Sequence, residues 1–505
     1  MPNLIFLLLR LQKKQTMKKI IFSTLFTLLT CAFVLAQDYT TPNTGVTWTL
    51  DDIAAASPTT VTISGSNYTL LGNLTIAAND AVIIDSDLTL LIAADKLITV
   101  FGAFTIDSNS VTITALDENA PYEGFRFEEF SEIDINNATI QYGGGLRVLT
   151  ETFSIDNCTI INNVSGATTS AAIQLSRGMP QITNNTISFN DNPAIGSAAN
   201  SAVSAFIFNN TIEGNNKANS NRPQINLGTT LANEPLQIIQ NTIIGDSALD
   251  QAGGIAVANF VGGNLNVIIA TNTIRGNRYG ITILGINDSV EITNNIIEDN
   301  NIQGDPNLGG SGINLNSSTV SAAVVVSGNE IRRNLWGITL QGSASINLGD
   351  DATNPGNNIF AENENGGETY ALYNNTANTI SAKNNCWIEG QQSTEQQVED
   401  VIFHSVDDPT LGEVIFNPFL CGVLGIADNT VENFSFYPNP AKNEINFNNI
   451  VSFEKVEIFG IQGNLIIAKS ISEGQNTLPI NLPSGLYFVN FSNDAQTVTK
   501  KMIVQ

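Results

Sequence analysis

The chain has 505 residues, and its hydrophobic content of 42% is ample for a buried core, so length and composition do not favour a disordered chain. The formal net charge of −26 comes from 47 Asp and Glu residues against 21 Lys and Arg residues. Because such a surface repels phosphate groups, nucleic acids and anionic membranes are not expected as partners.

The first 36 residues have the pattern of an export signal. Lys18 and Lys19 follow Met17 and precede an apolar run that ends at a small residue, Ala36. We predict a signal peptide at residues 1–36, of which 1–16 are an upstream extension, with the true start at Met1 or Met17. No later apolar stretch reaches about 18 residues, which predicts no transmembrane segment.

We expect an N-terminal cap at residues 37–65 and a solenoid with a C-terminal cap at residues 66–425. Within it, an element of the form Asn-x-Thr-Ile, followed three residues later by Asn, recurs with variations from residue 136 to 390. Its apolar anchors are Ile140, Ile160, Ile187, Ile212, Ile243, Ile274, Ile297, Ile331, Phe360 and Trp387.

Two polar columns accompany the anchors. Two positions before them stand Ala138, Cys158, Asn185, Asn210, Asn241, Asn272, Asn295, Asn329, Asn358 and Asn385. Three positions after them stand Asn163, Asn190, Asn215, Asp246, Asn277, Asn300, Asn334 and Asn363. If each repeat is one solenoid turn, like residues stack at about 4.8 Å, so that Ile packs on Ile and Asn amides form ladders.

A second short strand follows the anchor in most repeats, as in Gly280-Ile281-Thr282-Ile283 and Gly337-Ile338-Thr339-Leu340. This alternation is strand periodicity, and the intervening Asn and Gly are turn formers. The repeats resemble those of right-handed parallel β-helix proteins. The resemblance implies an all-β chain containing a right-handed parallel β-helix, a pectate-lyase-like solenoid, followed by a small C-terminal β-sandwich.

The end of the solenoid carries two further predictions. Trp387 is expected to close the apolar core as a cap residue. Cys386 and Cys421 both fall in the predicted cap, and whether they form a disulfide stays open. Cys158 occupies an Asn column and is expected to be a buried thiol.

Residues 428–505 have a different composition. Their spaced motifs include Pro438, Asn439 and Pro440, then Gly463, then Gly485 and Tyr487, and finally Lys500. This set resembles the C-terminal sorting domain of the type IX secretion system. The resemblance implies a Bacteroidetes-type secreted or outer-membrane-surface protein. It also implies the type IX machinery as a partner, with release or attachment to surface lipopolysaccharide left open.

No catalytic, cofactor-binding or metal-binding residue is predicted. The only histidine, His404, has no second His for a zinc site and reads as a cap or surface residue. The Gly-His-Gly element of polygalacturonases and the Asp-Pro-His-Asp element of alginate epimerases are absent. Carboxylate pairs such as Asp350-Asp351 could serve acid/base chemistry or hold calcium, the one cofactor considered.

Arg275, Glu298 and Arg332 each follow an anchor by one position in successive repeats. We predict that they share one outward column as an alternating-charge ladder, with a structural role.

Two classes of function stay open. The first is a non-catalytic secreted or surface protein that binds glycans or mediates adhesion through the polar face of its solenoid, with extracellular polysaccharide as ligand. The alternative is a polysaccharide lyase or glycoside hydrolase. Converging acids in a cleft would favour the enzyme, and evenly paired charge ladders would favour the first class.

Overall fold

The computed structural model describes residues 37–166, 170–420, 436–447, 453–460, 464–472, 476–493 and 497–505. The predicted signal peptide, Gly463 and Cys421 lie outside these residues. The chain divides into two compact units, one holding the solenoid up to Leu420 and one holding the C-terminal domain, and each is described by itself.

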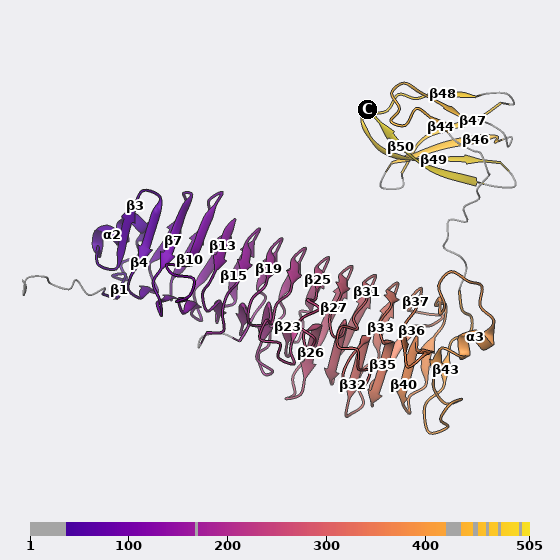
Figure 1. Cartoon of the computed structure of the whole chain (residues 1–505), viewed down its shortest axis with the longest axis horizontal. Helices are drawn as coiled ribbons and strands as arrows, with labels where there is room; N and C mark the ends of the chain where they lie inside the picture. The colour runs from indigo at the N-terminus through magenta and orange to yellow at the C-terminus, as the bar shows by residue number, and fades with distance from the viewer. Residues whose placement is uncertain are drawn as a thin grey trace, which may run out of the picture. The chain divides into compact units, whose positions relative to one another are not determined.

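The first unit is a parallel β-helix, which confirms the predicted fold class. Its strands stack in a row from the indigo end to the orange end of Figure 1, and they form three long parallel sheets. The chain visits these sheets in the order A, B, C, so one turn of the solenoid contributes one strand to each.

The strands of sheet A are β1 (Tyr39–Thr40), β5 (Leu74–Ile76), β8 (Leu97–Val100), β11 (Gly124–Phe127), β14 (Leu146–Val148), β17 (Ile173–Leu175), β20 (Ile195–Ser197), β23 (Pro223–Leu227), β26 (Gly253–Asn259), β29 (Ile281–Gly285), β32 (Ser311–Ser317), β35 (Trp336–Gly342), β40 (Leu372–Thr376) and β42 (Ile402–Phe403). The strands of sheet B are β2 (Thr47–Trp48), β6 (Ala81–Ile84), β9 (Ala103–Ile106), β12 (Glu132–Asn136), β15 (Thr152–Asp156), β18 (Gln181–Thr183), β21 (Phe206–Phe208), β24 (Leu236–Ile239), β27 (Asn266–Ala270), β30 (Ser289–Thr293), β33 (Val324–Ser327), β36 (Ile346–Gly349), β41 (Ile380–Ala382) and β43 (Val414–Ile415).

The strands of sheet C are β3 (Val61–Ser64), β4 (Asn67–Leu70), β7 (Leu88–Ile92), β10 (Val111–Ala115), β13 (Ala138–Gln141), β16 (Thr159–Ile161), β19 (Thr186–Ser188), β22 (Thr211–Glu213), β25 (Thr242–Ile244), β28 (Thr273–Arg275), β31 (Ile296–Glu298), β34 (Glu330–Arg332) and β37 (Ile359–Ala361). Helix α2 (Leu50–Ala56) lies near the N-terminal end, and α3 (Glu395–Glu399) and the hairpin β38 (Glu364–Asn365)–β39 (Glu368–Thr369) belong to the last turns. Within residues 37–65, β1 and β2 already pair with β5 and β6.

The predicted anchors form one column in sheet C. The register pairs Ile243 with Ile274 and Ile274 with Ile297, and these side chains are fully buried. At the end of the column Trp387 stacks on Phe360, with ring centroids 4.9 Å apart and planes 5° apart. Burial of each such side chain contributes about 1.5–3 kcal/mol, so the column is a continuous apolar spine.

Two interior Asn ladders flank sheet C. Each ladder Asn follows a turn residue with positive φ, such as Asn184 before Asn185 and Thr271 before Asn272, so the chain turns sharply and the amide points inward. Asn185 Nδ2 donates to Asn210 Oδ1 at 3.0 Å, and Asn210 Nδ2 donates to Asn241 Oδ1 at 2.9 Å. These bonds satisfy buried polar groups at the two corners that flank sheet C.

One predicted ladder member is wrong. Asp246 does not enter the second ladder, although it stands three positions after its anchor. Gln224, from the start of β23, occupies that level instead: its Oε1 accepts from Asn215 Nδ2 at 3.1 Å, and its Nε2 donates to Asn277 Oδ1 at 3.0 Å. The neutral amide both accepts and donates, whereas a buried carboxylate could only accept.

The predicted charge ladder is right in register and wrong in its pairs. Arg275, Glu298 and Arg332 do share one column. However, Glu298 lies 2.7 Å from Nη2 of Arg333, and Arg332 pairs with Glu330 and Glu389. Arg333 also binds Asp299, because both residues occupy the positive-φ position of the same corner in successive turns.

Asp80 ties the N-terminal end of the solenoid together. Its buried carboxylate accepts hydrogen bonds from the backbone N–H groups of Asn43, Thr44, Gly45 and Val46. Burial alone raises the pKa of Asp80, but the Thr41 hydroxyl and these N–H groups outweigh it and lower the pKa to about 2.

We therefore expect acid to loosen the first turn. Because the folded pKa of Asp80 lies below its unfolded value of 3.8, the carboxylate stabilises the folded state above that pH, and this stabilisation is lost as the pH falls through about 2. The contribution to the free energy of unfolding is about 2 kcal/mol. Asp80→Asn should increase hydrogen exchange of residues 37–80 at pH 6, and its difference from wild type should shrink near pH 2. The exposed Asp85→Asn is the control. Equal exchange of Asp80→Asn and wild type at pH 6 would contradict this.

The C-terminal unit contains two antiparallel sheets, as predicted. One comprises β44 (Phe436–Tyr437), β45 (Glu444–Phe447) and β48 (Thr477–Pro479), and the other β46 (Lys455–Gly460), β47 (Leu465–Ser470), β49 (Gly485–Ser492) and β50 (Thr497–Val504). They share one apolar core that includes Ile445, Ile458 and Phe491.

Candidate functional site

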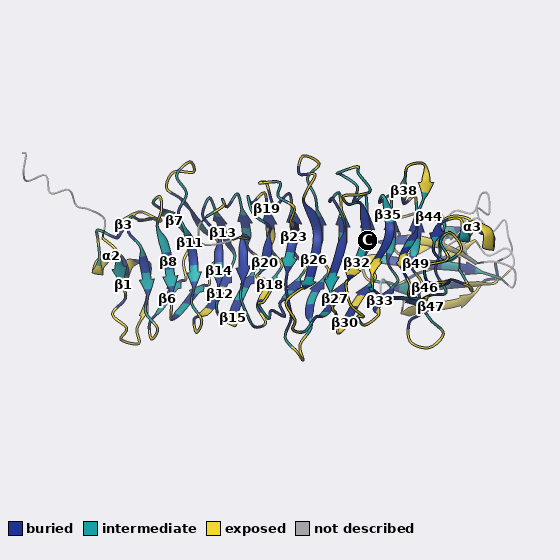
Figure 2. Ribbon diagram, turned by 90° about the horizontal axis from the view of Figure 1, so that it is seen from below, coloured by how far each residue is buried: buried dark blue, intermediate teal, exposed yellow. Residues whose placement is uncertain are grey.

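The outward face of sheet A carries the candidate site. The register aligns Gln174, Gly196, Asn226, Ala256, Thr282, Asn314, Thr339, Tyr373 and Phe403 as one column. These positions alternate with buried residues such as Ile281 and Ile283, so they face away from the core. Figure 2 labels several strands of this sheet, among them β20, β23, β26, β32 and β35.

A cleft of about 500 Å³ lies on the C-terminal half of this face. We call it the Trp336 cleft. Its floor is the column from Thr282 to Tyr373, and its wall is loop 299–310, which joins β31 to β32. Its lining residues are Asn221, Arg278, Tyr279, Thr282, Leu284, Pro306, Asn307, Leu308, Gly309, Ser311, Asn314, Trp336, Thr339, Gln341 and Tyr373.

Aromatic rings line the C-terminal side of the Trp336 cleft. The ring of Trp336 lies 5.0 Å from that of Tyr373 and 4.7 Å from that of Tyr370. Tyr373 stacks on Phe403 of the next turn at 4.6 Å. The Trp336 indole N–H donates to the carbonyl oxygen of Pro306 at 3.0 Å, which fixes the ring against loop 299–310. The result is a rigid aromatic platform beside a polar floor.

The floor is a chain of hydroxyl and amide groups. The Ser311 and Thr339 hydroxyl oxygens are 3.0 Å apart, and the Thr339 hydroxyl donates to Asn314 Oδ1 at 2.9 Å. The strands approach closely here: a Cβ on Gly280 would lie 2.5 Å from the carbonyl oxygen of Gly312. Glycine is therefore required at the entry of these strands, and the residue before it, Tyr279 or Ser311, faces the cleft.

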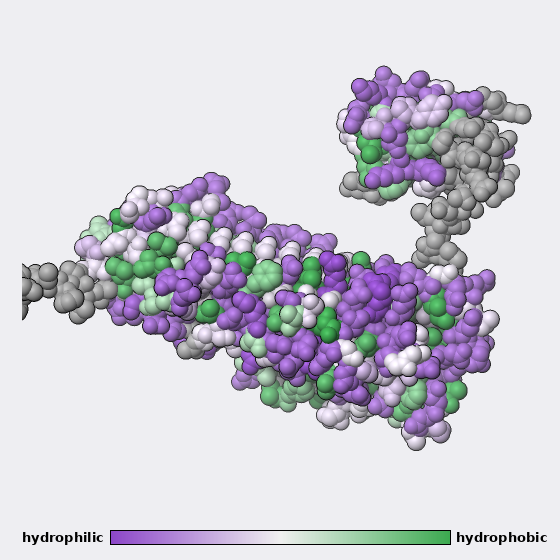
Figure 3. Space-filling model, in the orientation of Figure 1, coloured by the Kyte–Doolittle hydropathy of each residue, from purple (hydrophilic) through white to green (hydrophobic). Residues whose placement is uncertain are grey.

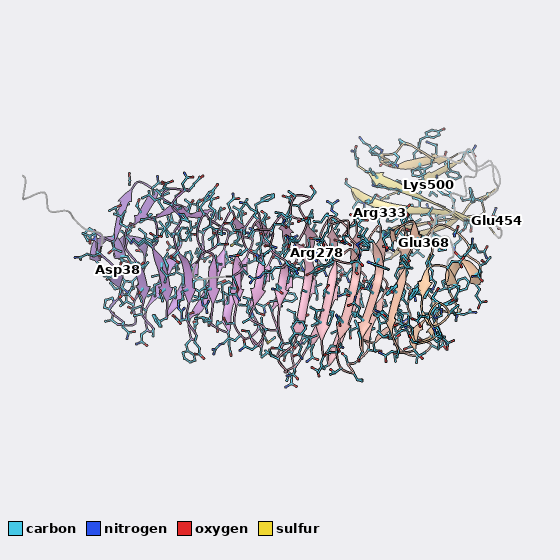
Figure 4. The ribbon with its side chains drawn as sticks, turned by 60° about the horizontal axis from the view of Figure 1, so that its bottom comes forward. Asp38, Arg278, Arg333, Glu368, Glu454 and Lys500 are labelled. Atoms are coloured by element: carbon cyan, nitrogen blue, oxygen red, sulfur yellow. The ribbon has the colours of Figure 1, made fainter. Side chains whose placement is uncertain are left out.

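Arg278 is the only cationic residue of the Trp336 cleft lining. Its side chain is 8% exposed, Nη1 donates to Asn221 Oδ1 at 2.5 Å, and Nη2 donates to the carbonyl oxygen of Leu308. Both acceptors are neutral. Arg278 is labelled in Figure 4, which draws the side chains around it. Burial raises the pKa of the adjacent Tyr279 to about 12, although the positive charge of Arg278 acts against this, so the phenol is neutral at physiological pH.

A smaller cleft of about 220 Å³ lies on the same face, and we call it the Gln174 cleft. It is lined by Ser170, Gln174, Pro193, Gly196, Ser197, Ala198, Arg222 and Asn226. Asn221 lines the Trp336 cleft and Arg222 lines the Gln174 cleft, so loop 214–222, which joins β22 to β23, borders both.

Acidic and metal-binding groups are not gathered here. Neither lining contains Asp, Glu or His. Across the described residues, no group of three or more His, Cys, Asp and Glu side chains could hold a metal ion. The acidic pair Asp350-Asp351 lies elsewhere: the Asp350 carboxylate accepts from backbone N–H groups of residues 352–354 in its own turn, which lowers its pKa. On the face shown in Figure 3, hydrophilic residues predominate over the C-terminal half of the solenoid.

The residues singled out from the sequence lie apart from these clefts. Ile187, Ile212, Ile243, Ile274 and the ladder amides of Asn185, Asn210, Asn241 and Asn272 are in the core, as is Trp387. His404 is buried in the last turns, where Nε2 lies 2.7 Å from Glu399 and Nδ1 accepts from the Val414 N–H at 2.9 Å. Burial raises the pKa of the Cys158 thiol to about 12. Whether Cys386 and Cys421 form a disulfide stays open, because Cys421 lies outside the described residues.

The sorting-motif residues lie in the second unit. Asn439 links the start of the domain to its last strand, because its Nδ2 donates to the Lys501 carbonyl oxygen and its Oδ1 accepts from the Ile503 N–H. Gly485 and Tyr487 are in β49, and the Tyr487 hydroxyl donates to the Pro483 carbonyl oxygen at 2.9 Å. Lys500 is an exposed residue of β50, and Pro438 and Pro440 flank Asn439.

Comparison with known families explains the C-terminal unit. Residues 435–505 match the family model described as "Secretion system C-terminal sorting domain". No curated protein and no solved structure matches the chain. The chain therefore carries a type IX sorting domain, which makes the type IX machinery a partner and indicates a secreted or cell-surface protein. The described residues contain no helix of the length and apolarity that a bilayer requires.

Proposed function

We propose that the protein, after its export, binds a glycan on the outward face of sheet A and does not catalyse its breakdown. The single observation that carries this proposal is the Trp336 cleft, which combines aromatic rings with hydroxyl and amide groups. Sugar rings present apolar C–H faces and polar edges, and such a surface offers stacking for the first and hydrogen bonds for the second.

The lining chemistry favours binding over hydrolysis. Glycoside hydrolysis uses two carboxyl groups that flank the scissile bond, and neither cleft lining contains a carboxyl group. A lyase needs a base, and the raised pKa of Tyr279 disfavours its phenolate at neutral pH. Both features support an adhesive or glycan-capturing role for the solenoid.

Trp336→Ala should weaken glycan binding at least about tenfold, because truncation of a central aromatic anchor typically costs about 2 kcal/mol. Trp336→Phe keeps a ring and should retain most of the affinity. A glycan array with the full chain, followed by titration of the best ligands, measures this. Phe260→Ala removes a ring that is 68% exposed and outside both cleft linings, so it is the matched control.

Two outcomes would contradict the proposal. One is equal binding by Trp336→Ala and wild type, which would place the site elsewhere. The other is depolymerisation of a bound polysaccharide, measured as new reducing ends or as absorbance of unsaturated products, which would establish the enzymatic alternative.

A further inference from the structure

We infer that the glycan is acidic, and that Arg278 and Arg222 recognise carboxylate or other anionic groups spaced along one chain that lies across both clefts. This inference rests on the proposed function and names the class of its ligand. Arg278 is more than nine-tenths buried, and within the described part of the chain its guanidinium forms no ion pair with a carboxylate.

A buried guanidinium without a counter-charge is costly. An ionised group taken out of water is normally paired with an opposite charge, and Arg332, whose side chain is 16% exposed, follows that rule because it is bound to both Glu330 and Glu389. Among the described residues, the Arg278 guanidinium hydrogen-bonds only to the Asn221 amide and the Leu308 carbonyl, and its Nε has no hydrogen-bond partner. An anion in the cleft would supply the missing charge.

The neighbours of Arg278 hold it in place for such a ligand. Loop 214–222 reaches it through Asn221, and loop 299–310 reaches it through Leu308. A Cβ on Gly309 would lie 2.9 Å from Cγ of Arg278, so the loop backbone packs directly on the side chain. A guanidinium fixed in this way loses little conformational entropy on binding, and its planar fork suits a carboxylate or a sulfate.

Arg222 supplies a second positive charge on the same face of sheet A. It is exposed, it lines the Gln174 cleft, and it directly precedes β23. Arg278 lies three positions before the first residue of β29. In sheet A only β26 lies between β23 and β29, so these two strands are roughly 10 Å apart along the solenoid axis. Among the described residues, neither guanidinium belongs to an ion pair with an Asp or Glu side chain.

The spacing suggests which acidic polymers fit. The chain as a whole has a net charge of −26, so a polymer with a charge on every sugar would be repelled by much of the surface. A polymer whose acidic units alternate with neutral ones would place charges near Arg222 and Arg278 and neutral rings on the aromatic platform. Its affinity should fall with salt.

The test compares acidic polysaccharides with their own neutral forms. Hyaluronan, which has alternating acidic units, and alginate, which is acidic at every unit, are titrated with the full chain beside their carboxyl-reduced derivatives. We expect hyaluronan to bind best, and Arg278→Met to weaken binding of the acidic form at least about tenfold while leaving the carboxyl-reduced form unchanged. Arg222→Met should have a smaller effect in the same direction, and Arg177→Met, outside both cleft linings, should have none.

Each outcome decides between the two proposals. If Arg278→Met weakens both forms equally, Arg278 only supports the loops and the inference is wrong. If native and carboxyl-reduced polymers bind equally, or if only neutral glycans of the array bind, the proposal of glycan binding is supported and the inference of acid recognition is wrong. If no polysaccharide binds, both fall. Because Arg222 is exposed, its variant reports on recognition even where Arg278→Met disturbs the loops.

Discussion

Replacing Ile274 with aspartate should unfold several turns of the solenoid. Ile274 is fully buried and lies between Ile243 and Ile297 in the spine of sheet C. Its neighbours above and below in the column are both isoleucines, so they offer the new buried carboxylate no partner. Such a charge costs several kcal/mol, and in a stack of repeats the loss acts on the neighbours above and below.

Hydrogen exchange with mass spectrometry on the full chain should show the loss directly. We expect reduced protection across β25, β28 and β31 in Ile274→Asp, together with a lower thermal midpoint. Thr273→Asp is the matched control, because Thr273 is the preceding residue of the same strand and faces outward. Equal protection in Ile274→Asp and wild type would mean that position 274 does not face the core.

Much of the fold is predictable from the sequence, because stacking converts a repeat into a column. The Ile274 and Asn272 columns follow from fixed offsets within each repeat. The prediction failed where a residue from outside the repeat forms the ladder hydrogen bonds. Gln224 replaces Asp246 in the ladder although it belongs to β23, an earlier strand of sheet A, and the offset alone gives no sign of this.

Ion pairs are less predictable than columns. Glu298 and Arg332 share a register position, but Glu298 binds Arg333, one residue further on. The reason is the positive φ of Arg333, which turns its side chain toward the same corner as Asp299. A long side chain can reach partners at several positions, so the backbone register does not determine which ion pairs form.

The candidate site was missed because it is assembled from strands separated by loops of unequal length. One signal was available: an aromatic or hydroxyl residue before Gly-Ile in Tyr279-Gly280-Ile281, Ser311-Gly312-Ile313 and Trp336-Gly337-Ile338. Read as a column, it marks the cleft side of sheet A. The loop that covers Arg278 has no comparable sequence pattern, so only the structure reveals that the Arg278 guanidinium is buried.

Asn272→Ala tests whether the ladders carry stability as well as register. Asn272 Oδ1 accepts from the N–H of Asn241 at 2.8 Å and from its Nδ2 at 3.0 Å, and Asn272 Nδ2 donates to the Ile238 carbonyl oxygen and to Asn295 Oδ1. Alanine would remove all four bonds inside a site that is 1% exposed. Because buried groups would lose their partners, we expect a cost of roughly 3–5 kcal/mol.

The expected pattern separates the ladder from a simple loss of volume. Protection should fall at the corners between sheets B and C in the turns of Asn241, Asn272 and Asn295, and the thermal midpoint of the full chain should drop. Asn316→Ala removes an exposed amide that bonds Gln341 and should change little. If Asn272→Ala behaves like Asn316→Ala, water or a backbone shift satisfies the freed groups, and the Ile spine alone would hold these turns in register.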